Sequence, residues 1–199
     1  MLAITFGVLL AFGLNATWER RQADAFTATS LRLMTEELAR NYAATERSLD
    51  YHVELLPRMR ALGPDAGLVG LPYRGFQPPQ LETAAYRLAL ESAVFARMEP
   101  ETSEALIGAY TQFERVTATH EVFAEKVPDL IVDTDGLRDP RFTRFAVASF
   151  TQLIYVEGEA LNAVAPVIDE DGAGAYWTVL RPVRDVPAEP EPPTAYDPE

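Results

Sequence analysis

The feature that most constrains this chain is a stretch without a helix breaker, because residues 14–56 contain neither glycine nor proline. Along this part of the chain, mostly apolar residues recur at spacings of three, four or seven, which is typical of one face of an α-helix. These residues are Leu31, Met34, Leu38, Thr45, Leu49, His52, Leu56 and Met59. Proline disfavours helix for the residue before it and lacks a backbone donor. We therefore predict one long helix that ends or kinks at Pro57.

The apolar run at the N-terminus indicates a membrane anchor. Residues 1–18 carry no charged side chain, and as a helix they would extend about 27 Å, close to the ~30 Å hydrocarbon core of a bilayer. Trp18 would lie at the membrane interface, where Arg20 and Arg21 could reach the headgroups. A cleaved signal peptide typically starts with a basic segment and ends in small residues, and Leu14 is too large for cleavage after Ala16. We predict a retained anchor rather than a signal peptide or a soluble core helix.

Small residues recur along this anchor at every fourth position, at Ala3, Gly7, Ala11 and Asn15. Small side chains at that spacing let two membrane helices approach closely, and the Asn15 amide could bond across such a pair. The alternative is that alanine and glycine are simply common in membrane helices and that Asn15 lies at the interface. Helix association through this face is therefore a hypothesis.

The segment Gly7–Arg21 resembles the start of a family of uncharacterised bacterial membrane-anchored proteins. Their pattern is an apolar run followed by Asn, Trp, Glu and Arg, which Asn15, Trp18, Glu19 and Arg21 match. Residues 78–98 are similar to a later helix of that family, with Ser92-Ala93 in place of Ser-Gly. The resemblance implies a single N-terminal anchor followed by a helical domain, and it implies no activity.

The orientation of the anchor is open to two interpretations. By the positive-inside rule, Arg20 and Arg21 alone would keep the following domain in the cytoplasm. Members of the resembled family usually carry a basic leader before the apolar run, which implies a domain outside the cytoplasm. We expect a single-pass protein of a bacterial inner membrane with its soluble domain in the periplasm.

Beyond the long helix, the sequence predicts three more helices and therefore an all-α fold. Prolines and one N-capping aspartate mark the expected helix ends, and these are Pro79, Pro100, Pro128, Asp139, Pro140 and Pro166. We predict a transmembrane anchor at 1–18, continuous with a roughly four-helix antiparallel bundle within 19–182. Residues 183–199, rich in proline and acidic residues, should form a disordered tail.

The segment between the first and second predicted helices, residues 63–79, is a loop by its glycine and proline content. It also holds the apolar residues Leu71, Tyr73 and Phe76. One interpretation is a loop packed over the end of the bundle. The other is a loop that binds a partner.

Composition and motifs argue against catalysis and nucleic-acid binding. The net charge of −13 opposes phosphate binding, and the absence of cysteine excludes disulfides and thiolate chemistry. The sequence contains no nucleophile elbow, phosphate loop or Glu-x-x-His metal pattern. His52 and His120 both fall on apolar stripes, where a histidine is more often a hydrogen-bonded core residue than a ligand. An enzyme would require these histidines to converge with carboxylates in a cleft.

We therefore expect a non-enzymatic interaction or scaffold subunit of an inner-membrane assembly, without catalytic, cofactor-binding or metal-ligating residues. Its expected partners are the lipid bilayer and either another protein or further copies of this chain, and nucleic acid is not expected. The alternative is a periplasmic sensory or ligand-binding helical domain that acts with a partner protein. Its pocket would be lined by the aromatic residues Tyr73, Phe76, Phe95 and Phe113.

Overall fold

The computed structural model describes residues 2–63, 67–68, 78–130 and 138–170, without the side chains of residues 2–14, 127–130 and 169–170. All regular structure within these ranges is helical, which confirms the all-α prediction. The elements are α1 (Leu2–Ala61), α2 (Ala84–Glu91), the 3-10 turn η1 (Phe95–Arg97), α3 (Pro100–Leu130) and α4 (Pro140–Glu170).

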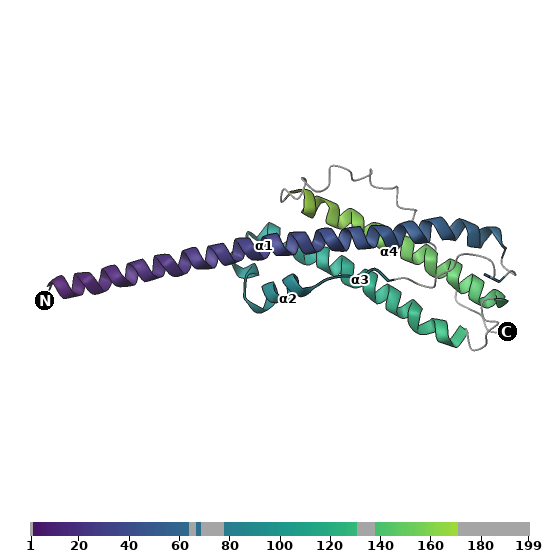
Figure 1. The fold of residues 1–199 in the computed structure, drawn as a ribbon, viewed down its shortest axis with the longest axis horizontal. Helices are drawn as coiled ribbons and strands as arrows, with labels where there is room; N and C mark the ends of the chain where they lie inside the picture. The colour runs from purple at the N-terminus through teal and green to yellow at the C-terminus, as the bar shows by residue number, and fades with distance from the viewer. Residues whose placement is uncertain (1, 64–66, 69–77, 131–137, 171–199) are drawn as a thin grey trace.

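Within the described residues, the bundle has three long helices and the short helix α2. The second half of α1 packs against α4, and α4 also packs along α3, while the first half of α1 projects beyond the bundle (Figure 1). Helices α1 and α3 run in the same direction and α4 runs in the opposite one (Figure 1). The predicted four-helix antiparallel bundle is therefore confirmed only as a helical bundle.

Helix α1 does not end at Pro57, which was one of the two alternatives that the sequence predicted, the other being a kink. It contains Pro57 and continues to Ala61. A proline inside a helix costs roughly 3 kcal/mol, but Leu55, Leu56 and Met59 around it are all buried in the core. Burial of each such side chain contributes about 1.5–3 kcal/mol, so packing on α4 outweighs the lost hydrogen bond.

The second predicted helix is much shorter than expected, because Pro79 does not begin it. Helix α2 starts at Ala84, and residues 78–83 before it are not helical. The reason is a contact with α1: Asn41 Nδ2 donates to the carbonyl of Glu82 at 2.8 Å, and the Glu82 amide donates to Asn41 Oδ1 at 2.7 Å. Both backbone groups of Glu82 are therefore bound to α1 before the helix starts. After α2 ends at Glu91, Ala93 takes a positive φ of 55°.

The predicted boundaries of the last two helices are confirmed at their starts and wrong at their ends. Helix α3 begins at Pro100, and α4 begins at Pro140 with Asp139 as its cap, because Asp139 Oδ1 accepts from the Arg141 amide at 2.8 Å. Both helices run past the proline expected to close them, α3 past Pro128 and α4 past Pro166. A proline near the last turn removes only one helical donor, which these helices tolerate.

The predicted membrane anchor, residues 1–18, corresponds to the N-terminal part of α1. In the part of the chain with described side chains, no helix has a stretch long and apolar enough to cross a membrane. Residues 1–14, which carry most of the predicted anchor, lie outside that part, so the anchor stays a prediction. The loop residues Leu71, Tyr73 and Phe76 and the tail 183–199 also lie outside the described residues.

Candidate functional site

The face of α1 that is buried in the bundle carries many polar residues. Its buried polar residues are Ser30, Thr35, Glu37, Asn41, Thr45, Ser48 and His52. Buried polar groups need hydrogen-bond partners, because an unsatisfied one costs about 1–3 kcal/mol. Partners on other helices gather in two clusters, one around Glu157 with residues of α3 and α4 and one around Glu37 with residues of α2 and α3.

The cluster around Glu157 joins the three long helices in the middle of the core. His52 Nδ1 on α1 lies 2.8 Å from Glu157 Oε2, and His120 Nε2 on α3 lies 2.9 Å from Glu157 Oε1. Ser48 Oγ, one turn before His52, donates to Glu157 Oε1 at 2.6 Å. The side chains of His52 and Glu157 are fully buried, and that of His120 is 1% exposed. One carboxylate on α4 therefore binds α1 and α3 together.

The Glu157 carboxylate is ionised. Burial raises its pKa, but hydrogen bonds from His120, His52 and Ser48, together with attraction to His52, outweigh burial and hold the pKa below its usual range. An ionised carboxylate only accepts hydrogen bonds, so His52 Nδ1 and His120 Nε2 are the donors. The site thus places one carboxylate between two imidazole rings.

Each imidazole ring has a second nitrogen that does not bond to Glu157, and we call it the outer nitrogen. These outer nitrogens, His52 Nε2 and His120 Nδ1, are buried without a hydrogen bond among the described residues. The same is true of Thr45 Oγ1 and Ser149 Oγ. The centroids of the His52 and His120 rings are 5.5 Å apart. The rings of His52 and Phe150 pack edge to face, with their centroids 4.7 Å apart. Unsatisfied polar atoms this deep in a core are rare in native proteins and often mark a functional centre. His52, His120 and Glu157, with Ser48 beside them, form the candidate site.

In the cluster around Glu37, no buried side-chain polar atom of the described residues lacks a hydrogen bond, and the role of the cluster is structural. The Glu37 carboxylate caps α2 by accepting from the Ala85 amide at 2.9 Å and the Tyr86 amide at 3.3 Å, and Tyr110 Oη donates to it at 2.7 Å. Tyr86 and Tyr110 stack with centroids 4.1 Å apart. Burial, followed by the bond to Glu37 and its charge, raises the pKa of Tyr110. The cluster therefore docks α2 on α1 and α3.

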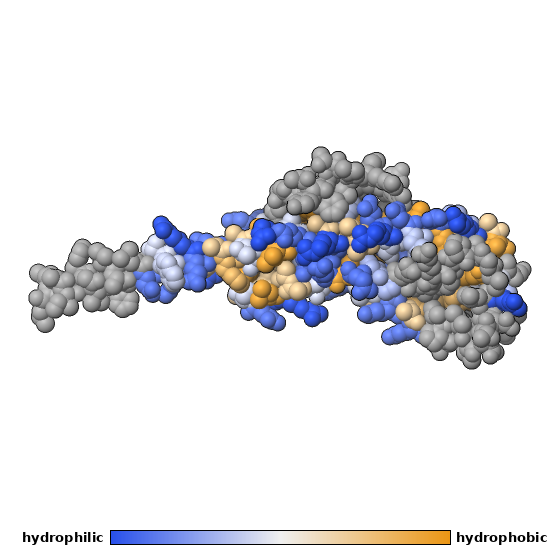
Figure 2. Space-filling view, viewed as in Figure 1, coloured by the Kyte–Doolittle hydropathy of each residue, from blue (hydrophilic) through white to orange (hydrophobic). Residues whose placement is uncertain are grey.

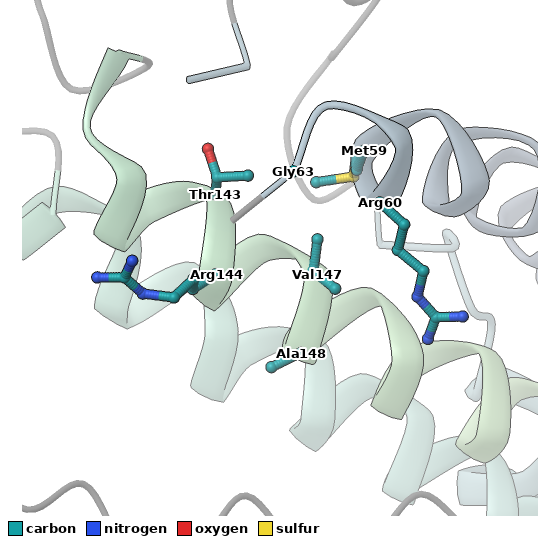
Figure 3. A pocket seen from close by; sticks show the side chains of 7 residues that line it. All are labelled: Met59, Arg60, Gly63, Thr143, Arg144, Val147 and Ala148. Atoms are coloured by element: carbon teal, nitrogen blue, oxygen red, sulfur yellow. The ribbon is translucent and has the colours of Figure 1, made fainter. Parts of the chain in front are cut away.

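A pocket of about 320 Å³ lies elsewhere, between the end of α1 and the start of α4. Figure 3 shows the side chains of Arg60 and Arg144 extending outward from it and those of Met59, Val147 and Ala148 between them. Arg60 Nη2 donates to Thr151 Oγ1 at 3.1 Å.

The predicted aromatic ligand pocket does not coincide with this pocket. Phe113 is buried in the core and Phe95 packs edge-on against Tyr86. Neither residue lines the pocket beside Arg60. Tyr73 and Phe76 lie outside the described residues.

The predicted membrane-interface residues lie on the projecting part of α1. Asn15, Trp18, Arg20 and Arg21 are all exposed, and Trp18 is 64% exposed. Asn15 Nδ2 donates to Glu19 Oε1 at 2.7 Å, one turn away on the same helix. The side chains of Ala3, Gly7 and Ala11 lie outside the described set, so the association face is not tested.

The prediction that His52 and His120 are hydrogen-bonded core residues is confirmed, but their convergence on Glu157 was missed. An enzyme would require the two histidines to converge with a carboxylate and to do so in an open cleft. The histidines do converge on Glu157, but the three side chains are buried in the core rather than exposed in a cleft. A signal was present in the sequence: Glu157 falls on the apolar stripe of α4, between Leu153 and Ala160. A charged residue at such a position is expected to have a buried partner.

Fold and site together define an all-helical protein with two histidines and one glutamate at the centre of its bundle. The chain matches no protein-family model, no curated protein and no solved structure.

Proposed function

We propose that this protein is a membrane-anchored interaction module that carries its helical bundle on a rod-like first helix, in the periplasm of a bacterium. One observation supports the proposal: α1 runs unbroken from the apolar N-terminal run into the bundle, and among its described side chains, from Asn15 onward, the first buried one is Ser30. From Trp18 to Ser30 the helix extends about 18 Å. An anchor at residues 1–18 would therefore hold the bundle clear of the membrane surface.

The projecting part of α1 has a surface suited to helix association. Figure 2 shows hydrophobic residues exposed where this part meets the bundle. Phe26 and Leu33 of α1 are 43% and 36% exposed, and they lie seven residues apart, on one face of the helix. An apolar seam with this spacing favours pairing with another helix. The occupant proposed for it is a second copy of the chain, since the same helix would be anchored beside it.

Membrane attachment is tested by fractionating cells that express the full chain and washing the membranes with alkaline carbonate. We expect the protein to resist the wash and the variant Leu9→Arg to be released, because an arginine in mid-run opposes insertion. Ala28 is exposed on α1 beyond the predicted anchor, so Ala28→Arg is the matched control and should stay in the membrane. Release of the unaltered protein would contradict the anchor. An alkaline phosphatase fused to the C-terminus reports orientation, because it is active only in the periplasm.

Pairing of α1 is tested by disulfide crosslinking, which is clean here because the chain has no cysteine. Gln22 lies one turn before Phe26 on the same face, whereas Ala28, two residues after Phe26, lies on another face. We expect Gln22→Cys to form dimers in native membranes and Ala28→Cys to form few. Adding Phe26→Ala and Leu33→Ala should reduce the Gln22→Cys crosslink. Equal crosslinking at both positions would contradict a specific seam.

A further inference from the structure

We propose that His52, His120 and Glu157 bind one divalent transition-metal ion of the Zn²⁺ class in the core of the bundle. Each residue offers one ligand atom, and these three atoms all lie within 4.8 Å of one another. They come from α1, α3 and α4, so no single helix carries a recognisable metal motif.

Side-chain rotation has to adjust the geometry before such an ion fits. Bonds of about 2.0–2.1 Å from a tetrahedral zinc place its ligand atoms roughly 3.3 Å apart. The two nitrogens now lie 2.8 Å and 2.9 Å from different oxygens of Glu157, so each of these pairs must separate by about half an ångström. The three ligand atoms lie within 4.8 Å of one another, so a pair at that limit would have to close by about 1.5 Å. On binding, His52 Nδ1 and His120 Nε2 would lose their protons to solvent, and each ring would take up one on its other nitrogen and stay neutral.

The donor set selects the kind of metal. Two imidazoles and one carboxylate suit zinc and its first-row neighbours, whereas calcium and magnesium prefer six or more oxygen ligands. Three protein ligands leave a fourth position for water or another small ligand.

The surroundings supply part of the second layer that metal sites have. A ligating carboxylate is usually held by a further hydrogen bond, and Ser48 Oγ donates one to Glu157 at 2.6 Å. A ligating histidine usually donates its other N–H to an acceptor, but His52 Nε2 and His120 Nδ1 have no hydrogen bond among the described residues. Within those residues the second layer is therefore present at the carboxylate and not at the two rings.

The test uses the full chain, purified in detergent with an affinity tag that contains no histidine. We expect about one zinc per chain by elemental analysis, and removal by a chelator that Zn²⁺ or Co²⁺ alone reverses. Cobalt should give the visible absorption bands of a four-coordinate site, and Zn²⁺ should abolish them. At ~100 times its Kd, the ion should raise Tm by roughly 5–10 °C.

Variants assign the ion to this cluster. Glu157→Gln and His120→Gln should weaken Zn²⁺ binding by at least ~10-fold. Ser149→Ala removes a buried hydroxyl on α4 that is no ligand, and it should bind like the unaltered protein. If Glu157→Gln fails to fold, X-ray absorption of the zinc-loaded unaltered chain decides the matter, because two imidazoles must appear in the first shell.

Three results would overturn the proposal. The first is that neither Zn²⁺ nor Co²⁺ binds or shifts Tm, which would leave a metal-free histidine–glutamate network. The second is binding that survives both ligand substitutions unchanged. The third is an X-ray absorption spectrum without imidazole.

Discussion

Tyr110 on α3 donates a 2.7 Å hydrogen bond to Glu37 on α1, and the same carboxylate caps the N-terminus of α2. The negative charge therefore lies at the positive end of a helix, where anions are stabilised. A helix of eight residues is too short to be stable alone. Its place in the structure depends on this buried carboxylate and on the bonds from Asn41 just before it.

Glu37→Gln should therefore destabilise the protein. An amide has one acceptor oxygen where the carboxylate has two, so at least one of the donors at Ala85, Tyr86 and Tyr110 loses its partner. We expect a loss of about 1–3 kcal/mol in the free energy of unfolding, measured by urea denaturation. Glu36→Gln, on the exposed side of α1, is the control and should cost less than ~0.5 kcal/mol. Equal losses would contradict the capping role.

Tyr110 should make the protein sensitive to alkali. Its pKa is raised in the folded state, so this contribution to stability is complete below pH ~10, where unfolded tyrosine begins to ionise. Above that pH it declines by up to about 1.4 kcal/mol per pH unit. The variant Tyr110→Phe should show a shallower loss of stability between pH 9.5 and about 11. Parallel curves for the two proteins would refute this prediction.

Two neighbouring hydroxyls on α1 should respond oppositely to removal. Ser48 donates to the ionised Glu157, so Ser48→Ala should cost about 1–3 kcal/mol. Thr45 Oγ1 is buried without a hydrogen bond among the described residues, so Thr45→Val, which keeps the shape, should be neutral or stabilising. Both are measured by denaturation with chelator present, so that metal does not contribute. A larger loss for Thr45→Val would show that its hydroxyl has a role.

Pro57→Ala should stabilise the protein. Pro57 is exposed and lies inside α1, so alanine restores a helical donor and removes a steric conflict without changing the core. We expect a gain of about 1–3 kcal/mol, seen as a higher Tm. A lower Tm would indicate that the bend or stiffness introduced by the proline is needed for packing on α4.

The sequence predicted the long helices well because their buried faces repeat within the helix itself. Leu106, Tyr110, Phe113, Val116 and His120 are all buried in α3, as their spacing indicates. The extent of α2 could not be predicted in this way. It is set by Asn41 and Glu37, which lie more than forty residues earlier and act through backbone groups that leave no pattern in the local sequence.

The candidate site was even harder to predict from the sequence, because it depends on contacts between different helices. Each histidine was placed in the core by its position on an apolar stripe, but the partner of each lies on another helix. Glu157 is two residues from Glu159 in the sequence, and only Glu157 is fully buried. The stripe of α4 distinguishes the two carboxylates. The stripe does not predict that His52 and His120 contact the same carboxylate, since this shared contact depends on how α1, α3 and α4 are aligned along one another.

The continuity of α1 has a mechanical consequence. Glu37 and His52 are fifteen residues apart, roughly 22 Å and close to four full turns along one shaft, so both polar clusters contact nearly the same side of it. A torque applied at Asn15 reaches both without crossing a hinge. Because both clusters hold the same continuous helix by hydrogen bonds, rotation of the shaft would strain the bonds of both buried carboxylates, Glu37 and Glu157, and not those of one alone.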